Sequence, residues 1–285
     1  MLKQWVFLLI TSWAWQVHAL PAFTDIYGSA QLADIAYSNG DHQASLHSIG
    51  HKLHRQTVLP NVEVNYLLSE KDGVQYITVR GTANLQNALV DLDINLKQDT
   101  KLNILVHQGF AQAAELIYQD VQPLLNKARP IQTTGHSLGG AVAVILAMYL
   151  KTDGFDLPQV ITFGQPKVTN VTGANAFDDL PLLRVVTPDD AVPLVPPLSP
   201  LQIKNLDVYW HMGEEMILLP DQQYTMTSGL KAMLRATKFT DALPGEHNLN
   251  AHKMQTYLSL IVSKLHEAKE VPYQTGINLF GLSLD

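Results

Sequence analysis

The sequence predicts an α/β fold in which a mostly parallel central sheet is flanked by helices. Two observations lead to this prediction. Short apolar strand patterns alternate along the chain with longer helical patterns, an order that produces parallel strands joined by crossover helices. The 285 residues are 46% hydrophobic and 16% charged, which suits a globular protein with a sizeable core.

The elements are predicted in chain order. Apolar residues at helical spacing predict a helix within residues 21–38. Period-two alternation predicts strands at 62–66 and 74–79, and Lys71, Asp72 and Gly73 form a turn signal between them. We further expect strands at 102–106, 131–134, 160–163 and 182–186, helices at 109–127, after Ser137 and at 249–267, and a hairpin from 208–210 and 216–219.

The first nineteen residues have the pattern of a cleaved secretory signal. Lys3 gives a positive start, residues 5–15 are largely apolar, and Val17 and Ala19 are small residues before the expected cleavage site. We therefore expect an exported protein, secreted or periplasmic, with residues 20–285 as a single domain. An uncleaved N-terminal anchor is the alternative.

Charge and cysteine content exclude several classes. The net charge is −7 and no basic cluster occurs, so no nucleic-acid partner is expected. Cysteine is absent, which removes disulfides and thiolate metal sites.

Residues 135–140 read Gly-His-Ser-Leu-Gly-Gly and lie between a strand pattern and the apolar stretch 141–150. A serine framed by glycines between strand and helix is the nucleophile elbow of the α/β-hydrolase fold. Small neighbours allow the strained turn that exposes Ser137, and the Leu138 amide lies at a helix N-terminus, where negative charge is stabilised. A glycine-rich helix start with a capping serine would give the same pattern.

A serine nucleophile needs an imidazole base and a carboxylate, which in this fold follow it in the order acid, then histidine. Asp189 and Asp190 follow the strand expected at 182–186, and either could be the acid. His247 and His252 are the late candidates for the base, with His211 further upstream. A solvated aspartate loop and ordinary surface histidines are the alternative interpretation.

A second oxyanion donor is expected from an earlier loop. Residues 79–82 end a strand pattern and turn at Gly81, so the amide and hydroxyl of Thr82 are the candidates. An ordinary glycine turn at the end of a strand is the alternative.

With these segments in view, residues 62–262 resemble the class 3 lipase family of fungal-type triacylglycerol lipases and their relatives. The similar segments, in family order, are 80–82, 106–110, 135–141, 162–168, 190–193 and 252–258. The resemblance implies Ser137 as nucleophile, Asp190 as acid, His252 as base, and Thr82 and Leu138 as the oxyanion hole. It also implies a short lid at residues 83–90. Two departures are Ala88, where the family often has a bulky aromatic, and Lys167, where arginine is common.

The function implied is that of a secreted, bacterial-type serine hydrolase that cleaves lipid esters through an acyl-enzyme. Triacylglycerol is the first candidate substrate, and a lipid–water interface is the candidate place of action. Phospholipase A-type or carboxylesterase activity is the alternative within the enzymes, and a non-catalytic lipid-binding protein is the alternative outside them. No metal or organic cofactor is expected, and the sequence predicts no oligomeric state.

Overall fold

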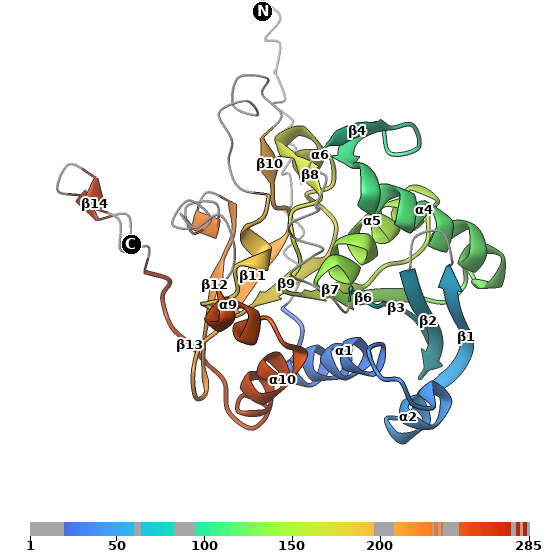
Figure 1. Ribbon diagram of the computed structural model, residues 1–285, viewed down its shortest axis with the longest axis horizontal. Helices are drawn as coiled ribbons and strands as arrows, with labels where there is room; N and C mark the ends of the chain where they lie inside the picture. The colour runs from blue at the N-terminus through green and yellow to red at the C-terminus, as the bar shows by residue number, and fades with distance from the viewer. Residues whose placement is uncertain are drawn as a thin grey trace, which may run out of the picture.

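The computed structural model describes residues 20–59, 64–82, 95–196, 208–229, 231–232, 235, 245–274, 278–279 and 282–283. Within these residues the largest sheet has the strand order β1-β2-β3-β6-β7-β9-β11-β12-β13 (Figure 1). Strands β3, β6, β7, β9 and β11 run parallel, whereas β1 and β2 at one side and β12 at the other pair antiparallel with their inner neighbours. The predicted mostly parallel sheet is confirmed.

The bounds of its strands match most of the expected ones. They are β1 (Lys52–Leu59), β2 (Val64–Lys71), β3 (Val74–Val79), β6 (Ile131–His136), β7 (Gln159–Phe163), β9 (Leu182–Val186), β11 (Glu214–Leu218), β12 (Gln223–Thr227) and β13 (Lys269–Glu270). A smaller sheet has the order β10-β8-β5-β4, and β14 pairs with β15. These strands are β4 (Leu96–Asp99), β5 (Ile104–His107), β8 (Thr169–Asn170), β10 (Tyr209–Trp210), β14 (Asn278–Leu279) and β15 (Leu282–Ser283).

Helices cover both faces of the large sheet, α4 and α5 on one face and α1 and α10 on the other (Figure 1). The described helices are α1 (Phe23–Ile35), α2 (His42–Ser48), α4 (Gln108–Val121), α5 (Leu138–Thr152), α6 (Val171–Ala176), α9 (Glu246–Ala251) and α10 (Met254–Val262), with 3₁₀ turns η1 (Gln122–Leu124) and η2 (Val192–Leu194). In the described part of the chain, no helix has the length and apolar character needed to cross a bilayer.

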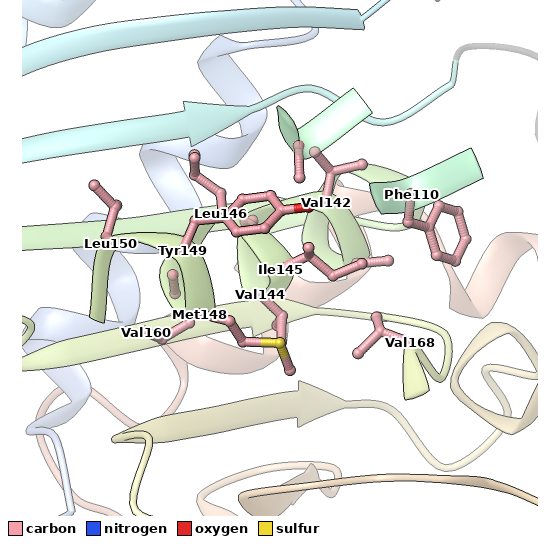
Figure 2. Packing of buried hydrophobic residues seen from close by; sticks show 14 of the residues in the cluster. Phe110, Val142, Val144, Ile145, Leu146, Met148, Tyr149, Leu150, Val160 and Val168 are labelled. Carbon is pink, nitrogen blue, oxygen red and sulfur yellow. The ribbon is translucent and has the colours of Figure 1, made fainter. Parts of the chain in front are cut away.

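The core lies on both sides of the central strands. Strand β7 shows the division, because Val160 packs in the cluster around α5, whereas Ile161 and Phe163 pack in the cluster that contains α1 and α10. Figure 2 shows the first cluster, in which the α5 side chains from Val142 to Leu150 pack together with Phe110 of α4 and Val160 of β7. Every residue of α5 from Gly139 to Leu150 is buried. This burial fixes the N-terminus of α5 against the sheet.

Two expected elements are wrong in detail. The stretch 208–210 does not form a hairpin with 216–219, because β10 pairs with β8 in the smaller sheet and β11 pairs with β12 and β9. The single helix expected at 249–267 is two helices, α9 and α10, separated at His252 and Lys253. This interruption places His252 in a turn and not on a helix face.

Candidate active site

Ser137 occupies the sharp turn between β6 and α5. Its backbone has φ 59° and ψ −134°, in the left-handed half of the map that non-glycine residues rarely enter. Such a conformation costs about 1–3 kcal/mol and persists only where the surroundings enforce it. Here the Ser137 N–H donates to the Phe163 carbonyl of β7 at 2.9 Å, while the Ser137 carbonyl accepts the Gly140 N–H at 3.0 Å.

The glycines of the elbow are required by close approach. A Cβ on Gly139 would lie 2.5 Å from the Val79 carbonyl oxygen and 2.5 Å from the Arg80 carbonyl carbon. A Cβ on Gly135 would lie 2.6 Å from the Gly139 carbonyl oxygen. The start of α5 therefore packs directly on the end of β3, and any side chain at these positions would push the two apart.

Asp190 and His252 form a buried pair beside this turn. The His252 Nδ1–H donates to Asp190 Oδ2 at 2.7 Å, and the two residues are 3% and 1% exposed. The Tyr257 hydroxyl of α10 also donates to Oδ2 at 2.5 Å, and the Val192 N–H donates to Oδ1 at 2.8 Å. Burial and the neighbouring Asp190 charge raise the pKa of Tyr257 well above its ordinary value, so this phenol keeps its proton. Three donors thus stabilise the buried carboxylate.

His136 holds the backbone of His252. Its Nε2–H donates to the His252 carbonyl at 2.7 Å, and its Nδ1 accepts the Tyr37 hydroxyl at 2.9 Å. The two imidazole rings lie 4.4 Å apart between centroids. Burial, and secondarily the charge of His252, hold the pKa of His136 well below its ordinary value, so this ring is neutral. Because His136 directly precedes Ser137, these contacts place His252 beside the elbow.

The side-chain atoms that acid–base chemistry would use carry no hydrogen bond. Among the described residues, neither Ser137 Oγ nor His252 Nε2 has a partner, although both atoms are buried. Gly164 packs over the pair with φ 56°, and a Cβ there would lie 2.7 Å from both Asp190 Oδ2 and His252 Cε1. Because Gly164 has no side chain, the His252 imidazole can lie against its backbone.

The competing candidates lie elsewhere. His247 Nε2 lies 3.2 Å from Asp189 Oδ2, with the two side chains 79% and 58% exposed. Among the described residues there are thus two His–Asp pairs, one on the surface and one buried next to Ser137. The third candidate, His211, donates from Nε2 to the Pro193 carbonyl at 2.6 Å.

Both predicted oxyanion donors lie near the elbow. Leu138 is the first residue of α5, where amides have no partner within the helix. Thr82 is exposed and follows Gly81, on which a Cβ would lie 3.1 Å from Ser137 Cβ. The expected lid at 83–90 and the expected signal at 1–19 lie outside the described residues. No group of three His, Asp or Glu side chains in the described part of the chain could hold a metal ion.

A buried ion network, which the sequence did not reveal, joins Arg184 of β9, Glu215 of β11 and Arg235. Glu215 of β11 accepts Arg184 Nη1 at 2.7 Å and Arg235 Nε at 2.9 Å. Lys167, one of the two departures from the family pattern, donates from Nζ to the carbonyls of Leu194 and Pro196 at 2.5 and 2.8 Å. Lys167 therefore holds the turn that follows the Asp190 loop.

Comparisons with known proteins find similarity to lipases. Residues 76–199 match the model of the family described as lipase (class 3). A secreted mono- and diacylglycerol lipase of Fusarium solani is 32% identical over 160 residues, covering 53% of this chain and 46% of that protein. The chain spans less than half the length of the curated relatives it matches first.

Solved structures show the same fold. The Lip2 lipase of Yarrowia lipolytica superposes with a TM-score of 0.59 at 26% identity, over 69% of this chain and 78% of that one. Lipase II of Rhizopus niveus gives a TM-score of 0.60 at 24% identity, over 70% and 81%. The predicted α/β-hydrolase fold is confirmed. The relatives named above are fungal, so a bacterial type stays a prediction. By the matched family model and these likenesses, the chain is similar to the class 3 lipase family over residues 76–199.

Proposed function

We propose that this chain is a serine hydrolase that cleaves the carboxylic esters of lipids. One observation carries the proposal: Ser137 sits in a strained backbone conformation next to a buried His252–Asp190 pair. Strain of this kind is typical of functional residues and has no use in a helix cap. The side chain of Ser137 makes no hydrogen bond to the amides at the start of α5, which argues against the capping interpretation.

In the proposed mechanism, His252 takes the Ser137 proton as Oγ attacks the ester carbonyl. Asp190 holds the imidazole tautomer that leaves Nε2 free to accept and stabilises the charged ring. The amides of Leu138 and Thr82, assisted by the Thr82 hydroxyl, bind the oxyanion, and each such donor is worth about 2.7–4 kcal/mol in the transition state. The alcohol leaves with a proton from His252, and water then hydrolyses the acyl-enzyme with His252 again as base.

The proposed substrate is a lipid ester, with acylglycerols first. The relative from Fusarium solani is named for mono- and diacylglycerols, which supports glycerol esters as a class. The names of two relatives also include the word secreted, which supports export of this chain through residues 1–19. Residues 20–285 would then form one lipase-like domain.

The test compares the wild type with Ser137→Ala on tributyrin, a long-chain triacylglycerol, phosphatidylcholine and short p-nitrophenyl esters. We expect Ser137→Ala to lose roughly 10⁶-fold in kcat, the scale seen when a triad nucleophile is removed. The exposed Ser259→Ala is the control and should keep full activity. Circular dichroism and urea unfolding establish that each variant is folded.

Turnover retained in folded Ser137→Ala would contradict the serine-hydrolase proposal. Faster turnover of phosphatidylcholine than of acylglycerols would instead assign a phospholipase. A wild type that hydrolyses none of these esters and resists a fluorophosphonate label would identify a non-catalytic, lipid-binding protein.

A further inference from the structure

A cavity of about 510 Å³ lies between the loop that carries Asp190 and the chain that follows β13. Pro188 lines it from the loop, and Val271 and Tyr273 line it from the later segment. Its floor comes from β11 and β12, through Ile217 and Thr225. The volume is within the range of small-molecule sites, about 300–1,000 Å³.

One wall of the cavity is a buried cation. Arg235 is only 8% exposed, and its Nε and Nη2 donate to Glu215 at 2.9 and 3.4 Å. Its Nη1 is buried and has no hydrogen-bond partner within the described chain. Thr225 lines the same cavity, is 4% exposed, and its hydroxyl also lacks a partner there. Buried donors without partners are rare in native structures, so two at one cavity indicate a missing acceptor.

The local charge is also out of balance. Glu215 faces two guanidinium groups, because Arg184 Nη1 lies 2.7 Å from its Oε2. Asp190 also attracts Arg235, and the buried Lys167 interacts with Arg184, Arg235 and Glu215. Two buried carboxylates therefore face three buried basic side chains, which leaves at most one positive charge. A buried charge is costly unless it is paired.

The remaining walls are mainly apolar. Ile217, Leu219, Val271 and Pro188 contribute hydrocarbon surface to the cavity. We propose that this cavity binds an organic monocarboxylate with a hydrocarbon chain, the carboxylate at Arg235 Nη1 and the Thr225 hydroxyl and the chain along the apolar walls. A dianion such as phosphate would bring two negative charges against one positive charge, and it would make no contact with the apolar walls. Fatty acids released from lipid esters have this chemistry, and that link alone rests on the proposed function.

The experiment measures binding of octanoate to Ser137→Ala by isothermal titration calorimetry, so the result does not depend on hydrolysis. Octanol, acetate and inorganic phosphate are titrated in parallel. We expect octanoate to bind at one site. Octanol lacks the carboxylate and acetate lacks the long hydrocarbon chain, so each should bind at least about tenfold more weakly, which corresponds to 1.4 kcal/mol.

Variants locate the site. Arg235→Gln should weaken octanoate binding at least about tenfold, the effect of losing a hydrogen bond to a charged group. Thr225→Val has the same shape without the hydroxyl and should weaken binding about fivefold, as expected for one hydrogen bond. Val271→Trp fills the cavity without changing its charge and should abolish binding. Arg55→Gln removes an exposed arginine that is bound to Asp120 and should change nothing.

Three results would overturn the proposal. Absence of octanoate binding to Ser137→Ala would show that the cavity is not a carboxylate site. Unchanged binding in both Arg235→Gln and Val271→Trp would place octanoate elsewhere, as in the ester cleft. Phosphate binding as tight as octanoate binding would make this a site for small anions. Should Arg235→Gln fail to fold, Val271→Trp and Thr225→Val decide the question.

Discussion

The two consecutive aspartates after β9 have opposite surroundings. Asp190 is 1% exposed and accepts three hydrogen bonds, whereas the side chain of Asp189 is 58% exposed and pairs with His247. Of these two neighbouring aspartates, only the buried Asp190 can orient a base next to Ser137.

This contrast gives a matched pair of variants. Asp190→Asn should lower kcat roughly 10⁴-fold at neutral pH, because the amide cannot hold the imidazole tautomer that the mechanism needs. Asp189→Asn should leave kcat within twofold, since its ion pair is in water and such pairs contribute about 0–1 kcal/mol. Steady-state kinetics on a p-nitrophenyl ester measures both. Equal losses in the two variants would contradict the assignment of Asp190.

Tyr257→Phe tests the second donor to Asp190. The ring would keep its packing in the cluster around α1 and α10, but the carboxylate would lose a charge-assisted hydrogen bond. We expect kcat to fall about 10- to 100-fold with KM unchanged, since the interaction is worth roughly 1.5–3 kcal/mol and each 1.4 kcal/mol is tenfold in rate. A rise in KM with kcat unchanged would show that Tyr257 acts on substrate binding instead.

How far the sequence reveals the site depends on the kind of residue. Ser137 can be recognised in the sequence because its turn requires glycines at fixed spacing on both sides. Tyr37 cannot be recognised there, because its contact with His136 joins residues 99 positions apart and leaves no local pattern. Gly164 has a similar reason for being missed: only the folded chain brings Asp190 and His252 against it.

At the scale of elements, α5 is the anchor of the site. Its residues from Gly139 to Leu150 are all buried, several of them in the cluster that Figure 2 shows, and its first residues rest on the end of β3. The glycine and alanine residues at its start allow this approach, and the larger side chains further along fill the core. The position of Ser137 therefore depends on packing that extends well beyond the site.

Leu146→Ala measures this dependence. Leu146 is fully buried in the cluster around α5, so its truncation should lower the free energy of unfolding by about 2–5 kcal/mol. Leu124 is 51% exposed, and Leu124→Ala should stay within about 0.5 kcal/mol of the wild type. Urea unfolding gives both values. A loss below 1 kcal/mol for Leu146→Ala would show that the core does not enclose α5 as described.

Strand identity was easier to predict than strand pairing. The largely apolar central strands β7 and β9 stand out because they are buried on both faces and lie between polar loops. The partners of β10 and β11 could not be inferred, because a strand of two residues has no period and neighbours in sequence need not pair. Strand β1 was not predicted at all, since its exposed positions are occupied by Lys52, His54, Arg55 and Gln56.

At the scale of the whole molecule, buried histidines make stability depend on pH. Burial lowers the pKa of His51 to about 4 and that of His136 and His211 well below the ordinary value. In the unfolded chain each imidazole takes up a proton near pH 6.5, whereas the folded chain excludes it. The unfolded state thus binds more protons below pH 6.5, and stability falls as pH falls.

Each such histidine should contribute a slope of roughly 1.4 kcal/mol per pH unit between pH 6.5 and its folded-state pKa. We expect the free energy of unfolding, measured in urea from pH 7 to pH 4.5, to decline in this window. His51→Gln should reduce the slope of this decline by the contribution of one histidine. His266→Gln, at an exposed position, is the matched control. A wild type equally stable at pH 7 and pH 5 would contradict the burial of these rings.

The hydrogen bond from His136 to the His252 carbonyl joins residues that are 116 positions apart in the chain. Ser137 is synthesised first, Asp190 later and His252 last, so a nascent chain would carry the proposed nucleophile long before the proposed base. Ester hydrolysis would begin only when both end regions have docked, Tyr37 from the first and His252 from the last. Recovery of activity would accordingly report the completion of folding, later than any signal from the central sheet.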